Sequence, residues 1–119
     1  MHIRRLDTDN RMSQVVIHRD TVYLAGQVGE SMDAGIEQQT LETLQAIEKL
    51  LVDAGSNKEH ILSVTIYLKD IERDFAGMNT VWDRWLPEGV APARATVEAG
   101  MCESDILVEM SVIAAVAEQ

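Results

Sequence analysis

The sequence predicts an α+β fold in which two helices cover one face of a mixed β-sheet. Segments rich in β-branched residues are separated by two stretches whose apolar residues recur at helical spacing. Their order along the chain is roughly β-β-β-α-β-α-β-β. With 119 residues, the chain is long enough for one core but not two, so a single domain over residues 1–119 is expected.

Three strands are expected before the first helix. The runs "SQVVIHRD" (13–20) and "TVYLAGQVG" (21–29) are rich in β-branched residues and meet at Arg19-Asp20, which predicts a hairpin. A shorter strand is expected at residues 3–6.

Apolar spacing then predicts the first helix, with Asp33 as its N-cap and Gly55 as the residue that ends it. The residues that recur at helical spacing are Ile36, Thr40, Leu44, Ile47 and Leu51.

The second half of the chain predicts a strand, a helix and two further strands. The segment "HILSVTIYLKD" (60–70) alternates, with Leu62 expected on the side of Val64, Ile66 and Leu68. A second helix is expected from near Asp74 to Pro87. Its apolar stripe comprises Phe75, Met78, Val81, Trp82 and Trp85.

The last two predicted strands, at 90–100 and 106–116, point to an oligomer. The run "ILVEMSVIAAV" (106–116) is apolar on both of its faces, yet two helices can cover only one face of the sheet. A wet apolar face costs about 25 cal/mol per Å². We therefore expect the second face to be buried in a homo-oligomer.

Composition limits the possible partners and locations. The net charge is −10, from 10 basic and 20 acidic residues, which disfavours binding to nucleic acid or an anionic membrane. The one cysteine, Cys102, cannot form an intrachain disulfide and is expected to be a small apolar filler. The N-terminal sequence lacks a signal-like apolar core, so a cytoplasmic location is expected.

Two charged residues interrupt the last two predicted strands. Arg94 is expected to be paired, either in a salt bridge at a rim or interface, or as a fork that binds a carboxylate. Glu109 has two interpretations as well, an exposed residue of an edge strand or a carboxylate that orients water. Gly26 could reflect a bulge, close strand packing or backbone open to a ligand, and a structural role is favoured for Asn79.

Metal and cofactor sites are not expected. The three histidines share no ligand spacing, and the chain has no HExxH motif, P-loop or GxGxxG fingerprint.

The same C-terminal segments carry a family resemblance. "APARATVEAG" followed by "LVEMSVIAAV" resembles the signature of the Rid (YjgF-type) enamine/imine deaminases, in which an arginine precedes a glutamate by 15 residues, as Arg94 precedes Glu109. "YLAGQVG", "GSNKEHILSVTIYLKD" and "DFAGMNTVWDRWLP" are similar to other parts of that family, so the resemblance extends over about residues 2–117. Details such as "MSQVVIH", "GSNK" and "AGMN" are similar to the second Rid subfamily.

The resemblance implies a chorismate-mutase-like fold, a homotrimer with clefts between subunits, and hydrolysis of 2-imino or enamine acids such as 2-aminoacrylate without a cofactor. It implies that Arg94 holds the substrate carboxylate and that Glu109 guides the attacking water. Gly26 and Asn79 match other site positions of the family. The founding subfamily has a tyrosine in place of Met12, a serine in place of Ala25 and a cysteine in place of Thr96, so these three would alter the pocket wall.

Two other functions compete with the deaminase. One is a trimer that binds a carboxylate metabolite in the same cleft without turnover. The other is a stress-response holdase or an RNA-cleaving activity, against which the charge of −10 argues in the case of RNA.

Overall fold

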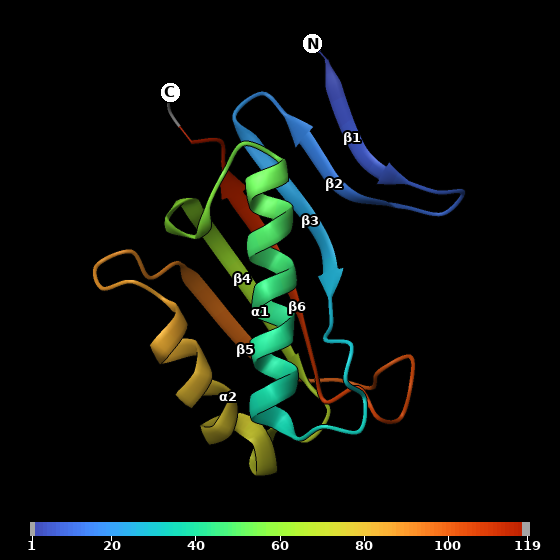
Figure 1. Ribbon diagram of the computed structural model, residues 1–119, viewed down its shortest axis with the longest axis vertical. Coiled ribbons are helices and arrows are strands. Elements are labelled where there is room, and N and C mark those ends of the chain that lie inside the picture. Colours follow the sequence, from blue (N-terminus) through green and yellow to red (C-terminus); the bar gives the residue numbers. More distant parts are fainter. Residues whose placement is uncertain (1, 118–119) are drawn as a thin grey trace.

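The computed structural model describes residues 2–117, which form a six-stranded sheet with both helices on one of its faces (Figure 1). The strand order is β1-β2-β3-β6-β4-β5. The elements are β1 (Ile3–Thr8), β2 (Ser13–His18), β3 (Thr21–Gln27), α1 (Ile36–Asp53), a short 3₁₀ turn (Lys58–His60), β4 (Ile61–Leu68), α2 (Ile71–Trp85), β5 (Ala93–Glu98) and β6 (Val108–Ala115). The fold class that the sequence predicts is confirmed.

Strand β6 lies inside the sheet although it comes last in the chain. It pairs antiparallel with both β3 and β4, whereas β4 and β5 are parallel. A parallel pair needs a crossover connection, and α2 supplies it. Strand β5 comes last in the strand order and is an edge strand, whereas β6 has a neighbour on each side and is an interior strand.

The core lies between the sheet and the helices. Alternate residues of β6, namely Val108, Met110 and Val112, are at most 1% exposed and face the helices. Helix α1 covers β3 and β6, and α2 lies on the same side next to β4 (Figure 1). Leu44 and Leu51 of α1 are fully buried in this layer.

The opposite face of the sheet is open in the single chain. Tyr23 and Ile113 lie opposite each other on β3 and β6 and are 44% and 38% exposed. Strand β6 thus presents apolar side chains to both faces, as its sequence predicts.

The helix starts differ from those predicted. Helix α1 begins after Gly35, not Asp33, and has no side-chain cap, whereas α2 begins at Ile71, well before Asp74. Asp70 caps α2 by accepting a hydrogen bond from the backbone N–H of Arg73 at 3.1 Å. The predicted end of α1 is close to the observed one, because Gly55 adopts a left-handed φ of 81° just after the helix.

Two apolar residues point away from their predicted positions. Leu62 is 51% exposed because the β4–β6 register shifts between Ile61 and Ser63, which turns Ile61 inward instead. Phe75 is 42% exposed, because the buried stripe of α2 runs through Asp74 and Met78 and leaves Phe75 beside it. None of the helices within residues 2–117 is long and apolar enough to cross a bilayer.

Candidate functional site

Arg94 lies on the edge strand β5 and faces α2. It is opposite Val64 of β4, which is buried under the helices, so the arginine projects from the helix side of the sheet. In the single chain, Arg94 is exposed at the edge of the sheet. Within residues 2–117 it forms no ion pair, so the predicted salt bridge is absent from the single chain.

Two residues of α2 hold the guanidinium group. The Nη1 atom of Arg94 donates a hydrogen bond to Oδ1 of Asn79 at 2.8 Å, and its Cζ lies 5.1 Å from the centre of the Trp82 ring. Stacking on an aromatic face favours arginine over lysine. With one N–H bound to Asn79, the remaining donors can bind a planar anion.

Thr96 shares the helix-side face of β5 with Arg94. It lies opposite Ile66 of β4, in the same alternation that places Arg94 opposite Val64. Its Oγ1 atom is buried and has no hydrogen-bond partner among the described residues. A buried hydroxyl without a partner is costly.

Glu109 lies on the opposite face of the sheet. Its neighbours Val108 and Met110 face the helices, so Glu109 points to the open side, opposite Tyr67 of β4. The interpretation of Glu109 as an edge-strand residue is wrong, because β6 is an interior strand. Within the described chain, no hydrogen bond or ion pair involves its carboxylate, which is therefore available to water or a ligand.

Gly26 lies directly against Glu109. The register between β3 and β6 shifts between Leu24 and Gln27, so Ala25 and Gly26 form an irregularity in β3. A Cβ atom on Gly26 would overlap Oε2 of Glu109 and would lie 3.0 Å from its Cδ. Both predicted structural explanations, a bulge and close packing, therefore apply here.

Met12 lies in the turn between β1 and β2. The carboxylate of Asp9 accepts hydrogen bonds from the backbone N–H groups of Arg11 at 2.7 Å and Met12 at 3.0 Å. These two hydrogen bonds hold the pKa of Asp9 below its usual range. Met12 itself is 42% exposed.

The predicted site residues thus form two groups on opposite faces of the sheet. The structure brings Arg94, Asn79 and Thr96 together on the helix side at the β5 edge. It brings Glu109 and Gly26 together on the open side. A single chain therefore does not unite the arginine with the glutamate.

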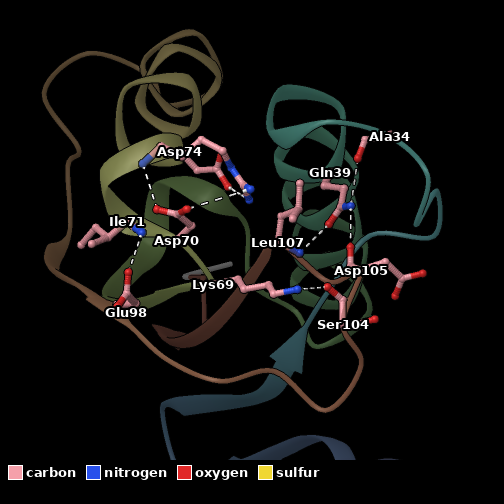
Figure 2. A network of polar contacts seen from close by, with 11 residues as sticks. Ala34, Gln39, Lys69, Asp70, Ile71, Asp74, Glu98, Ser104, Asp105 and Leu107 are labelled. Carbon is pink, nitrogen blue, oxygen red and sulfur yellow. Dashed lines mark hydrogen bonds and ion pairs between the residues drawn. The ribbon is translucent and has the colours of Figure 1, made fainter.

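A buried amide anchors the segment that leads into β6 (Figure 2). Gln39 of α1 is fully buried, and its Nε2 donates to the carbonyl oxygens of Ala34 and Asp105 at 3.1 and 3.0 Å. Its Oε1 accepts the backbone N–H of Leu107 at 2.9 Å. Lys69 also reaches this segment through the carbonyl of Ser104. These contacts fix the start of the strand that carries Glu109.

Sequence reasoning missed three residues near the two groups. Trp82 was predicted only as a core residue, and nothing local in the sequence marks Gln39 or Tyr67. The aromatic position of Trp82 on the α2 stripe, three residues after Asn79, is the one signal that could have indicated a contact with Arg94.

Cys102 belongs to neither the Arg94 group nor the Glu109 group. Cys102 is exposed in the connection between β5 and β6, so its prediction as an apolar filler is wrong. Across residues 2–117, no three His, Cys, Asp or Glu side chains gather in a way that could hold a metal ion.

Comparison with known proteins identifies the family. The family model described as Endoribonuclease L-PSP matches residues 2–116. The RutC family protein YoaB of Escherichia coli K12 is 47% identical over 116 residues, which cover 98% of this chain and 100% of that protein.

Solved structures agree in fold. An uncharacterized protein from Pseudomonas aeruginosa superimposes with a TM-score of 0.93 at 41% identity, covering 98% of this chain and 100% of its own. A member of the YjgF protein family from Neisseria meningitidis also gives a TM-score of 0.93, at 37% identity, covering 100% of this chain and 98% of its own. The chain therefore belongs to the family described as Endoribonuclease L-PSP, which is the YjgF or Rid family that its C-terminal strands resemble.

Proposed function

We propose that this protein hydrolyses 2-imino and enamine acids to 2-keto acids and ammonia, in a cleft formed between two protomers of a homotrimer. The observation that supports this most strongly is the held guanidinium of Arg94, which is fixed by Asn79 and Trp82 and keeps donors available for a carboxylate. Family membership is consistent with this activity. Placement in the second Rid subfamily and in the cytoplasm, like the single domain over residues 1–119, stays a prediction.

The proposed reaction begins with a carboxylate bound by two N–H groups of Arg94. Thr96, two residues along β5 on the same face as Arg94, adds a hydroxyl as a further donor or acceptor. Together they fix the position of the C=N carbon. The substrate's own carboxylate thus provides the binding energy, and no cofactor is needed for the steps that follow.

Glu109 then acts on the water molecule. Its carboxylate accepts a proton from water as the oxygen attacks the C=N carbon, and passes that proton to the nitrogen to give a carbinolamine. Glu109 then takes the hydroxyl proton of the carbinolamine and transfers it to the amino nitrogen, so that the C–N bond breaks, the keto acid forms and ammonia leaves. A positioned acid or base of this kind contributes about 10²–10⁴-fold.

The separation of the two groups supports a site shared between protomers. Because Arg94 and Glu109 lie on opposite faces of one chain, a site that contains both takes the arginine from one protomer and the glutamate from its neighbour. Such a contact joins two different surfaces. Contacts of this type close into rings, whereas a two-fold dimer joins identical surfaces. A trimeric ring meets this requirement.

Mixed oligomers test the proposed site. Arg94→Ala should abolish imine hydrolysis and Glu109→Gln should lower its rate about 10²–10⁴-fold, measured by the loss of semicarbazide-trapped imine from an amino-acid oxidase reaction. Co-refolding the two variants in equal amounts should restore about a quarter of the sites, because each site needs one intact group from each protomer. Normal turnover by a folded Arg94→Ala protein would refute the activity. Absence of recovery in proven mixed trimers would refute the shared site.

A carboxylate-binding protein without turnover is the second candidate, supported by the same Arg94 arrangement. Glu109→Gln separates the two functions. A binder keeps its affinity for a 2-keto acid and has no rate to lose, whereas an enzyme keeps affinity and loses turnover. The family description also mentions RNA cleavage, but a charge of −10 argues against an RNA substrate here.

A further inference from the structure

We infer that Gly26 is a positioning residue, whose missing side chain creates the space in which the Glu109 carboxylate lies. This inference rests on the proposed function, because it assigns to Gly26 the task of aiming the water-guiding carboxylate. It differs from a role for the backbone of Gly26 in binding substrate.

The space, and not the backbone conformation, explains the glycine. Of the seven glycines, Gly55 and Gly89 have a left-handed φ, whereas Gly26 does not. A side chain at position 26 therefore meets no conformational penalty of that kind. What it meets is Glu109, since a Cβ would overlap Oε2 and lie 3.0 Å from Cδ and 3.3 Å from Cγ.

The irregularity in β3 brings this position against the carboxylate. Leu24 lies opposite Val112 and Gln27 opposite Met110, so two residues of β3 occupy the place of one on β6. The bulge therefore places the Gly26 Cα against the side chain of Glu109, which is one residue before Met110.

Within residues 2–117, no hydrogen bond or ion pair holds the carboxylate. A donor would compete with water for its lone pairs, whereas packing against a bare Cα restricts the carboxylate and leaves both oxygens free to accept. The glycine thus restricts the orientation of the carboxylate without using its hydrogen-bonding capacity.

Gly26→Ala should therefore affect turnover more than folding. The Cβ would collide with the far end of a flexible side chain, which can move away at low cost, so the protein should still fold and assemble. The displaced carboxylate should lower kcat by about 100-fold, the loss that a misplacement of 1 Å can cause. KM should change little, because Arg94 binds the substrate from the other protomer.

The experiment compares Gly26→Ala with a matched control. Gly35→Ala adds the same methyl group at a glycine where a Cβ meets no atom within 4 Å, so its kinetics should equal those of the unmodified protein. Gly26→Ala/Glu109→Gln should be no slower than Glu109→Gln alone, because both changes remove the same function. If the two losses multiply, or if Gly26→Ala raises KM and leaves kcat unchanged, Gly26 acts through its backbone and the inference is wrong.

A crystal structure of Gly26→Ala separates this inference from the proposed activity. We expect the Glu109 carboxylate to be displaced from its position over residue 26, with the backbone of β3 unchanged. A carboxylate that stays in place while β3 shifts would overturn the inference even if the unmodified protein is an active deaminase. Conversely, displacement in a protein whose unmodified form hydrolyses no imine would support the packing relation and refute the proposed activity.

Discussion

Within residues 2–117, Asn79 is the one hydrogen-bond acceptor that contacts the side chain of Arg94. The bond from Nη1 to Oδ1 measures 2.8 Å, and the Trp82 ring supports the guanidinium from another direction. A side chain as long as arginine has high rotamer entropy, so each contact that holds it before substrate arrives lowers the cost of binding.

Asn79→Ala should weaken binding of the substrate carboxylate. Loss of a hydrogen bond to a charged group costs about 1.5 kcal/mol or more, and the exposure of Arg94 keeps the effect at the low end, so KM should rise about tenfold while kcat changes less. Steady-state imine hydrolysis measures both constants.

Thr80→Ala is the matched control for Asn79→Ala. It lies on the same turn of α2, where its hydroxyl donates a hydrogen bond to the carbonyl oxygen of Ala76. An unchanged KM in Asn79→Ala, or an equal rise in both variants, would contradict the role of Asn79.

At the residue scale the sequence predicts which side chains matter better than where they point. The interval between Arg94 and Glu109 is visible in the sequence, but their opposite orientation depends on the register of β5, β4 and β6. That register results from pairing between segments far apart in the chain. The same limit explains Leu62, which an irregularity in strand pairing turns outward.

At the element scale, the carboxylate of Glu42 holds the connection between β3 and α1. It accepts the backbone N–H groups of Glu30 and Ser31, both at 2.8 Å, the hydroxyl of Ser31 at 2.7 Å and the amide of Gln38 at 2.8 Å. These four donors, with the Gln38 amide as the largest contribution, lower the pKa of Glu42 to about 2. The connection is thus fixed by one ionised group.

Acid should release this connection. Because the pKa of Glu42 is lower in the folded state, its contribution to stability is fully present above the ordinary glutamate pKa near 4.5 and is lost as the pH falls towards about 2. Glu42→Gln should lower the free energy of unfolding at neutral pH and should show a weaker loss of stability between pH 4.5 and 2. Urea unfolding at several pH values measures both effects.

Glu88→Gln provides the comparison for the acid prediction. Glu88 is exposed in the loop after α2 and takes part in no hydrogen bond among the described residues. Identical pH dependence of stability in the Glu42→Gln and unmodified proteins would contradict the proposed hold on the connection.

Element types were easier to predict than element starts. The apolar stripes of α1 and α2 and the alternation in β4 indicated the right structure, because burial on one face imposes those periods. The predicted helix starts were wrong because the capping residue cannot be recognised from the spacing of apolar residues. Helix α1 uses Gly35 without a side-chain cap, and Asp70 caps α2 one turn before the predicted start.

At the scale of the whole molecule, the open sheet face should govern assembly. Tyr23 and Ile113 lie side by side across β3 and β6 on that face. A lysine at their centre would have to be buried between protomers without a partner, which is strongly unfavourable. Ile113→Lys should therefore produce monomers with unchanged helix content, whereas the unmodified protein should sediment as a trimer.

Val52→Lys is the control for the assembly prediction. Val52 is 62% exposed on α1, on the other side of the molecule from the open sheet face, so the same charge there should leave the trimer intact. Sedimentation velocity and far-UV circular dichroism report assembly and helix content. An Ile113→Lys trimer would show that this face does not mediate assembly.

The placement of Arg94 and Glu109 on opposite sides of one sheet has a consequence for regulation by abundance. Each protomer presents the arginine on one face and the glutamate on the other, so an isolated protomer contains two incomplete sites. Diluting the protein until its copies separate would then silence it, with no inhibitor and no unfolding.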